Sequence, residues 1–269
     1  MSDDNTETMA DVSNVSRETS RHRASHKGDT HVANGSHSEP AIAGNHPDEV
    51  KGCVGRDKHT TTPLPPEVTT IFGDRRDRAV AYHESLRTDA TTRGLIGPRE
   101  APRLWERHIL NCAVIGEVMV NGARVVDIGS GAGLPGIPLA LARPDLDITL
   151  IEPLLRRVTY LRETIDTLGL DNVTVVRGRA EEKTIITQHR GADYVTSRAV
   201  APLGKLMQWS LPLTTQHGLV LAMKGTSADD EIHRDQKAIS AAGGGPCTII
   251  RVGSDVLPEA TTIVRCERR

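Results

Sequence analysis

A glycine-rich segment in the middle of the chain carries the pattern with the clearest chemical meaning. Residues 125–142 read VVDIGSGAGLPGIPLALA, an apolar run that ends in an acid and is followed by closely spaced glycines. These glycines are Gly129, Gly131, Gly133 and Gly136. Glycine lets a backbone turn tightly and lets a ligand approach without a Cβ in the way. The segment therefore predicts a strand, a ligand-binding loop and a helix.

This loop fits two classes of nucleoside cofactor. Residues 131–136 match the G-x-G-x-x-G pattern of dinucleotide-binding proteins, in which a helix N-terminus faces a pyrophosphate. That match begins two residues after Gly129, which already ends the apolar run. In the other frame, Asp127 ends the strand and Gly-x-Gly-x-Gly follows. This frame resembles the first motif of the Rossmann-like S-adenosylmethionine-dependent methyltransferases, whose loop wraps the methionine and ribose of the cofactor.

Two further acidic positions support nucleoside binding. Glu152 ends a second apolar run ~20 residues after the loop, where a carboxylate accepts hydrogen bonds from ribose hydroxyls. Both cofactor classes use such an acid, and a helix N-terminal acid favoured by the macrodipole is the alternative. Ala180 and Glu181 follow a third apolar run. In the methyltransferase pattern an acid here approaches the adenine amino group, whereas a solvated charge pair is the alternative.

The pattern from residue 123 onward predicts the elements that position these residues. We expect strands at 123–129, 147–153, 172–178, 192–199, 218–225, 247–254 and 261–268, and helices at 135–144, 154–170, 203–213 and 227–245. Repeated strand–helix units predict an α/β fold with a mostly parallel sheet. The last two strands lack a helix between them, so they should form an antiparallel hairpin at one edge. Ligands in such sheets bind beyond the carboxyl ends of the strands.

The chain before this core divides into two regions. We expect one helix after Pro65 and another over 100–119, which together form a helical cap spanning 63–122. This cap and the core at 123–269 are expected to form one methyltransferase domain. Residues 1–62 are polar, hold six of the eleven histidines and have few large apolar residues. Such a stretch does not offset its ordering entropy, so we expect a disordered tail. Its irregular histidine spacing predicts no metal site.

The amino-acid composition limits the kinds of partner that the protein can bind. The 33 basic and 35 acidic residues nearly cancel, so any grip on nucleic acid must be a local patch. Six aromatic residues nearly exclude a base-stacking platform. There is no C-x-x-C pair, no signal peptide and no apolar stretch of membrane-spanning length. These features predict a cytoplasmic protein with no metal and no membrane partner, and we expect a monomer.

Four segments make the resemblance specific. They are GLPGIPLA at 133–140, TSRAVAPL at 196–203, RHILNC at 107–112 and MKG at 223–225. With the glycine loop they resemble the 16S ribosomal RNA guanine-N7 methyltransferase family, also called glucose-inhibited division protein B, over roughly residues 68–267. The resemblance implies a class I methyltransferase fold and methyl transfer from S-adenosylmethionine to guanine N7 in 16S rRNA of the small ribosomal subunit.

The motifs and the resemblance together assign a set of site residues. The residues expected to bind the cofactor are Asp127, Gly129, Gly131, Gly133, Leu134, Glu152, Ala180, Glu181 and Arg198. The residues expected to contact RNA are Arg103, Arg107, Arg156, Arg157 and Lys224, with a solvated surface as the alternative. Arg198 is also the expected catalytic residue, because it would orient guanine O6 or a phosphate, although an ion pair bracing its strand is the alternative.

Guanine N7 carries a lone pair and no proton, so its methylation needs no general base. Alignment in a water-poor pocket should supply most of the catalysis. Three other functions stay open from the residues: a methyltransferase of this fold with another substrate, an NAD-dependent oxidoreductase, and a ribosome-binding factor without catalysis.

Overall fold

A computed structural model of the chain describes residues 64–269. The predicted tail at 1–62, with its histidines, lies outside the described residues. The described part begins with helical segments: α1 (Pro66–Phe72), a 3-10 turn (Gly73–Arg75), α2 (Arg76–Ser85) and a π-helical turn (Leu86–Ala90). Pro66 is the first residue of α1, where its missing N–H has no intrahelical partner to lose.

The second predicted helix, over 100–119, is helical but not a regular α-helix. It consists of a 3-10 turn (Ala101–Arg103), a π-helical stretch (Leu104–Leu110), α3 (Asn111–Ala113) and a further 3-10 stretch (Val114–Val118). Its buried face includes Trp105, His108 and Ile109, so the segment packs on the rest of the chain despite its changing pitch.

Strands and helices then alternate as the pattern predicts. The strands are β1 (Arg124–Ile128), β2 (Asp147–Glu152), β3 (Val173–Arg177), β4 (Ala192–Arg198), β5 (Thr214–Met223), β6 (Gly244–Val252) and β7 (Thr261–Arg268). The helices are α4 (Gly136–Ala142), α5 (Leu155–Leu168), α6 (Lys183–His189), α7 (Leu203–Ser210) and α8 (Ala228–Ala241), with a 3-10 turn (Leu211–Leu213) after α7. The helix α6 was not predicted, and β5 and β6 start earlier than predicted, at Thr214 and Gly244.

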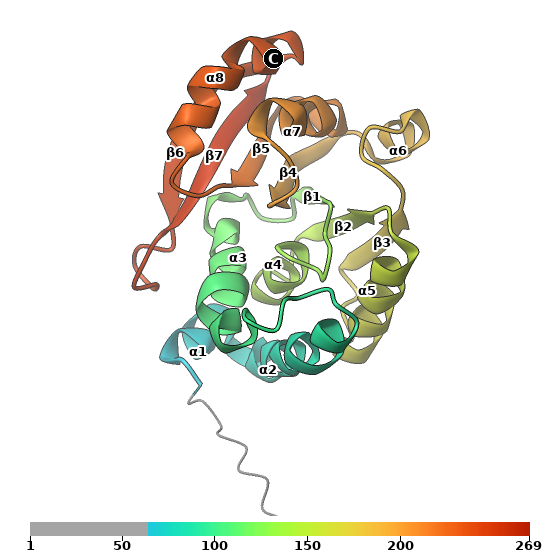
Figure 1. Cartoon of the computed structure of the whole chain (residues 1–269), viewed down its shortest axis with the longest axis vertical. Coiled ribbons are helices and arrows are strands. Elements are labelled where there is room, and N and C mark those ends of the chain that lie inside the picture. Colours follow the sequence, from blue (N-terminus) through green and yellow to red (C-terminus); the bar gives the residue numbers. More distant parts are fainter. Residues whose placement is uncertain (1–63) are drawn as a thin grey trace, which may run out of the picture. The chain divides into compact units, whose positions relative to one another are not determined.

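The sheet has the strand order β3-β2-β1-β4-β5-β7-β6. The first five strands pair in parallel, and β7 runs antiparallel to both β5 and β6. The predicted antiparallel hairpin at one edge is confirmed, and its second strand inserts between β5 and β6 (Figure 1). The strand order reverses beside β1, so the glycine loop lies at the switch point where ligands bind.

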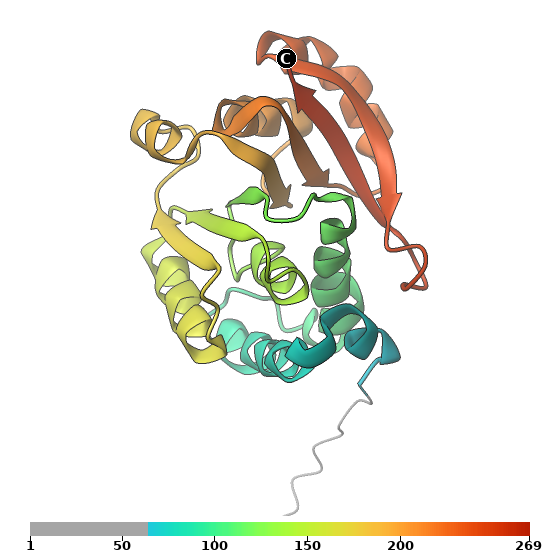
Figure 2. The ribbon, with the colours of Figure 1, turned by 180° about the vertical axis from the view of Figure 1, so that it is seen from behind.

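Two hydrophobic clusters cover the two faces of the sheet. Within β1, Val125 belongs to one cluster and Val126 to the other, as the alternation of side chains along a strand requires. The first cluster includes buried residues of α4 and α5 together with the N-terminal helices, and the second includes residues of α6, α7 and α8. Figures 1 and 2 show these two groups of helices on opposite sides of the sheet.

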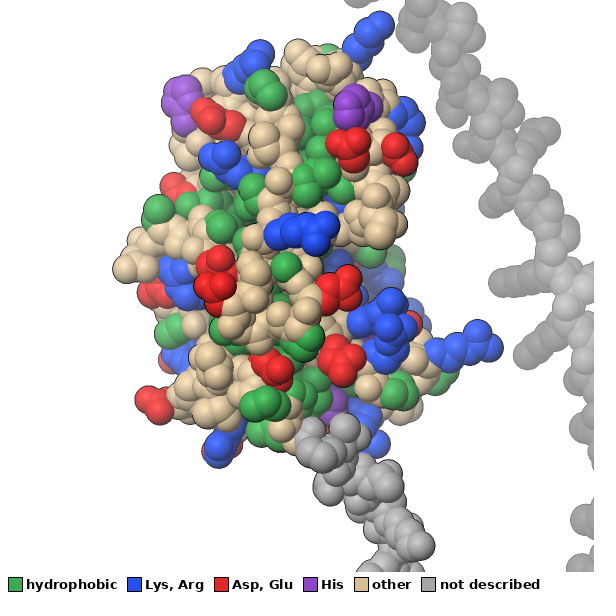
Figure 3. Space-filling model, turned by 90° about the vertical axis from the view of Figure 1, so that its left-hand side faces the viewer, with side chains coloured by type: hydrophobic (Ala, Val, Ile, Leu, Met, Phe, Trp, Pro, Cys, Tyr) green, Lys and Arg blue, Asp and Glu red, His purple; other side chains and the backbone are tan. Residues whose placement is uncertain are grey.

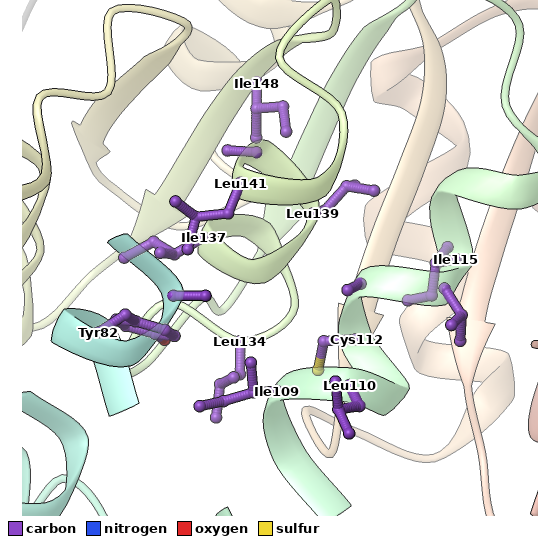
Figure 4. Packing of buried hydrophobic residues seen from close by; sticks show 14 of the residues in the cluster. Tyr82, Ile109, Leu110, Cys112, Ile115, Leu134, Ile137, Leu139, Leu141 and Ile148 are labelled. Carbon is purple, nitrogen blue, oxygen red and sulfur yellow. The ribbon is translucent and has the colours of Figure 1, made fainter. Parts of the chain in front are cut away.

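The N-terminal helices pack directly beneath the glycine loop. Tyr82 is fully buried and its hydroxyl donates to the carbonyl oxygen of Ala132 in the loop, at 2.8 Å. Figure 4 shows the surrounding packing, in which Ile109 and Leu134 are also buried. Burying such a side chain contributes roughly 1.5–3 kcal/mol, so this contact both stabilises the fold and fixes the loop. Within residues 64–269, no helix is long and apolar enough to cross a membrane.

Candidate active site

The glycine loop leaves β1 in a backbone conformation that favours glycine. Gly129, Gly131 and Gly133 have φ values of +69°, +60° and +97°. The Gly129 N–H donates to the carbonyl oxygen of Ile151 at 2.8 Å, which joins the loop to β2. A Cβ on Gly129 would lie 2.9 Å from Val200 Cγ2, so both the backbone and the available space require glycine there.

Asp127 holds the far end of this loop. It is fully buried, and its Oδ2 accepts the Gly136 N–H at 3.1 Å at the start of α4. Its Oδ1 has no hydrogen-bond partner among the described residues. Burial raises the pKa of Asp127 to about 7. A Cβ on Gly136 would lie 2.2 Å from Leu150 Cδ2, so the turn into α4 is closed against other groups.

Glu152 holds the near end of the loop. It is fully buried at the end of β2, with Oε2 accepting the Gly131 N–H at 2.9 Å and Oε1 accepting the Leu154 N–H at 3.0 Å. The Arg157 guanidinium lies 3.6 Å from Oε2. Each carboxylate oxygen has two acceptor sites, so Glu152 can also accept a hydrogen bond from a ligand.

A cleft of about 360 Å³ opens beyond the carboxyl ends of β1 and β2, at the size expected for a small-molecule site. It is lined by Ile128, Gly129, Ile151, Glu152, Pro153, Leu154, Arg157, Gly178, Arg179, Ala180, Glu181, Ala199, Val200 and Trp209. The mixture of apolar walls with two carboxylates suits a nucleoside, because an apolar slot holds the base and carboxylates accept from hydroxyl or amino groups.

Four of the predicted cofactor residues line this cleft: Gly129, Glu152, Ala180 and Glu181. The other five are not among its lining residues: Asp127, Gly131, Gly133, Leu134 and Arg198. Leu134 packs in the core instead (Figure 4).

Trp209 in α7 also lines the cleft and was not among the predicted site residues. Its indole ring lies under the Lys205 ammonium, 5.0 Å from the ring centroid, so a cation–π contact restrains it. The available signal was an aromatic residue on the first helix after the TSRAVAPL segment, in a chain with few aromatic residues.

Arg198 ends β4 directly before Ala199, which lines the cleft, and its side chain contacts the helical segment over 100–119. Its Nη1 donates to Cys112 Sγ at 3.5 Å, and its Nη2 bonds His108 Nδ1. On the other side of its ring, His108 Nε2 bonds Glu100 Oε2 at 2.7 Å. Burial and the neighbouring Arg198 charge lower the pKa of His108. Two side chains of the RHILNC segment, His108 and Cys112, therefore hold the Arg198 guanidinium.

Lys224 lies at the end of the next strand and has partners within the protein. Its ammonium donates to the Ala201 carbonyl oxygen at 2.9 Å and to Glu231 Oε2 at 2.8 Å. The same Glu231 oxygen accepts the Leu203 N–H at 2.9 Å. Lys224 thereby braces the segment between β4 and α7, while a contact with RNA stays a prediction.

The four arginines expected to contact RNA differ in their exposure. Arg103, Arg107 and Arg156 are exposed, whereas Arg157 is half-buried beside Glu152. Figure 3 shows acidic and basic side chains interspersed on the face that it presents, consistent with a net charge near zero. Among residues 64–269, no group of histidine, cysteine and acidic side chains is arranged to hold a metal ion.

The fold and the cleft define the class of protein first. The chain is similar to the solved apo structure of an S-adenosylmethionine-dependent methyltransferase, SibL, with a TM-score of 0.51 and 17% sequence identity, over 75% of this chain and 73% of that one. At this identity the likeness concerns the fold alone. It confirms the predicted class I methyltransferase fold, with its mostly parallel sheet and antiparallel hairpin.

Sequence comparison then gives the family. The family described as rRNA small subunit methyltransferase G matches residues 75–255, more than half of the chain. A Corynebacterium efficiens protein named ribosomal RNA small subunit methyltransferase G is 61% identical, over 78% of this chain and 91% of its own length. A Streptomyces coelicolor protein of the same name is 52% identical, over 76% of this chain and 85% of its own. The chain belongs to the rRNA small subunit methyltransferase G family, which confirms the resemblance of its motifs.

Proposed function

We propose that this protein transfers a methyl group from S-adenosylmethionine to N7 of a guanine in 16S rRNA of the small ribosomal subunit. Membership of the family supports the reaction and the class of substrate. Within the chain, the observation that carries the proposal is Glu152, buried at the end of β2, bonded to the glycine loop and lining the cleft. We propose a monomer that works in the cytoplasm, with the helical segments before residue 123 as a cap on the catalytic core.

The lining of the cleft fits the adenosine part of this cofactor. The free acceptor sites of Glu152 suit the ribose hydroxyls, and the bare backbone of Gly129 leaves room beside them. Glu181 can accept from the adenine amino group, with Ala180 and Trp209 as apolar walls. When bound, the sulfonium of the cofactor supplies an electrophilic methyl group.

The dinucleotide alternative is disfavoured by the turn into α4. A pyrophosphate would need free N–H groups at this helix N-terminus. The Gly136 N–H is already donated to Asp127, and Pro135 just before it has no N–H to offer. The close packing of Gly136 on Leu150 does not distinguish the two cofactor classes, because the third glycine of a dinucleotide motif also packs the helix against the strand.

The residues around the rim suit a reaction that needs alignment and no general base. Asp127 is sealed under the loop, and His108 is bonded on both sides of its ring. Neither side chain is in a position to remove a proton, and guanine N7 has none to give. Arg198 can present guanidinium hydrogens to guanine O6 or to a phosphate, which fixes N7 relative to the cleft.

RNA must also be held outside the cleft. Arg103 and Arg107 are exposed on the helical segment that carries His108, so they lie on the element that contacts Arg198. We propose that they bind phosphates near the target guanine, with an affinity that falls as salt rises.

The proposal can be tested in cells by chemical cleavage of rRNA at 7-methylguanine. Deleting the gene should remove one cleavage site from 16S rRNA. The wild-type gene should restore it, whereas a Gly129→Asp gene should not, because its side chain would meet Val200 and block the cleft. An unchanged cleavage pattern in the deletion strain would contradict the proposal. Subunit binding by a protein that restores no methyl group would indicate the non-catalytic ribosome-binding alternative.

A further inference from the structure

The Arg198 guanidinium is oriented by two side chains distant in the sequence. Its Nη1 bonds Cys112 and its Nη2 bonds His108, which precede it by 86 and 90 residues. Burial raises the pKa of Cys112 to about 11, so it meets the guanidinium as a neutral thiol, a weak acceptor. The stronger of the two restraints is therefore the imidazole of His108.

The hydrogen bonds of His108 define its protonation state. Arginine has donors only, so His108 Nδ1 must carry a lone pair. Its Nε2 lies 2.7 Å from a Glu100 carboxylate oxygen, so Nε2 must carry the hydrogen. His108 is 7% exposed, so water has little access to its ring, whereas the Glu100 side chain on its outer side is 38% exposed. The ring is neutral, in one tautomer, and links a carboxylate to the guanidinium.

We infer that His108 is a positioning residue for the proposed methyl transfer: its neutral Nδ1 orients Arg198, and Glu100 holds the ring in the required tautomer. This inference rests on the proposed function, which gives Arg198 a guanine or phosphate to orient. Protonation of Nδ1 would place its N–H against an N–H of the Arg198 guanidinium. The hydrogen bond that orients Arg198 would then be lost.

Three charged groups face His108. Glu100 lies just before the 3-10 turn, Arg198 ends β4, and Arg107 is on the same helical segment. Burial and the two arginines lower the pKa of His108 from 6.5, and Glu100 opposes them in part. Because the neutral ring is the competent form and its pKa is lowered, methyl transfer should be constant above pH 6.5, and the loss caused by protonation of His108 should set in only at a lower pH.

Two substitutions separate the two ends of the ring. In His108→Asn, the amide oxygen replaces Nδ1 as an acceptor and the bond to Glu100 is lost. In His108→Gln, the amide nitrogen replaces Nε2 as a donor to Glu100, and the acceptor beside Arg198 is lost. Both variants remove the imidazole, so a merely structural role would make them equally active or equally impaired.

The expected result is a difference between these two variants. The Asn variant should keep kcat within about threefold of wild type and lose the acid limb of the pH profile. The Gln variant should lose roughly tenfold or more in kcat, because a hydrogen bond to a charged group is lost, with unchanged cofactor affinity by calorimetry. His217→Gln, which alters an exposed histidine that also bonds a carboxylate, should match wild type.

Nitrogen-15 NMR of the histidine rings reports the tautomer of His108 directly and requires neither RNA nor an activity assay. The signals absent from His108→Asn belong to His108, and they should show an unprotonated Nδ1 and a protonated Nε2 at pH 7.5. The opposite tautomer, or equal activities of the two variants, would overturn the positioning role. Absence of methyl transfer by the wild-type protein would instead overturn the proposed function.

Discussion

Two buried acids at the ends of neighbouring strands have different roles. Glu152 lines the cleft and bonds the loop from the side of the ligand, whereas Asp127 is sealed beneath the loop and bonds the start of α4. The sequence pattern identified both acids because each ends an apolar run. The sequence pattern could not show which acid lines the cleft and which is buried beneath the loop, because this depends on how the loop folds between the two strands.

The environment of Asp127 has a measurable effect on stability. Its pKa rises from 3.8 to about 7 on folding, so the folded chain keeps a proton that the unfolded chain releases above pH 3.8. The contribution of Asp127 to stability is therefore present below pH 3.8 and is lost as the pH rises to 7, by up to about 4 kcal/mol.

Asp127→Asn should remove this part of the pH dependence of unfolding. Urea unfolding at several pH values from 4 to 8 would measure it, with the exposed carboxylate variant Asp77→Asn as the control. Identical pH profiles for wild type and Asp127→Asn would contradict a buried carboxyl with a raised pKa.

Among the helices and strands, those marked by short motifs were predicted more accurately than those that had to be found from hydrophobic periodicity alone. The glycine loop, β1 and β2 were predicted closely because apolar runs and glycines mark their limits. The helix α6 was missed because it buries only Ile185 and has no apolar face to detect. The first residues of β5 were missed because they are polar and His217 has a φ of +62° within that strand.

The geometry of the glycine loop predicts that replacing a glycine by alanine will have different effects at different positions of the loop. Gly129→Ala places Cβ 2.9 Å from Val200 at a φ of +69°, so it should weaken cofactor binding at least tenfold and lower the Tm. Gly131→Ala has a similar φ, but the nearest atom lies 3.9 Å away, so only backbone strain of about 1 kcal/mol is expected.

Calorimetry with S-adenosylhomocysteine and thermal unfolding would compare the two variants. The Gly225→Ala variant, which meets no atom within 4 Å, is the control. A Gly131→Ala variant more impaired than Gly129→Ala would contradict this account of the loop.

At the scale of the whole molecule, the sequence predicted the fold and the place of the cleft but not how its rim is assembled. Alternating strands and helices are local signals, and the position of the switch point follows from them. The bonds from the N-terminal helices to Arg198 join residues 86 and 90 positions apart, and one sequence contains no signal for such pairings. The contact between RHILNC and Arg198 therefore arises only when the chain folds.

The proposed phosphate contacts of Arg103 and Arg107 predict that their removal will reduce the salt dependence of binding to small subunits. Arg103→Ala with Arg107→Ala should weaken binding to small subunits and reduce the slope of log K against log salt by roughly one to two. Cofactor affinity should be unchanged, because neither arginine lines the cleft. A matched change of two other exposed arginines, Arg76 in α2 and Arg87 in the π-helical turn after it, should leave the slope as in wild type. An equal slope for the paired variant and wild type would exclude this segment from the RNA contact.

The most direct test is methyl transfer in a purified system. Labelled S-adenosylmethionine and the protein would be incubated with small ribosomal subunits from a strain lacking the gene, and mass spectrometry of RNA fragments would locate the label. We predict one methyl group per subunit, on N7 of a guanine in 16S rRNA, with strongly reduced transfer by Arg198→Ala. Measured cofactor binding without any transfer to the subunits would contradict it.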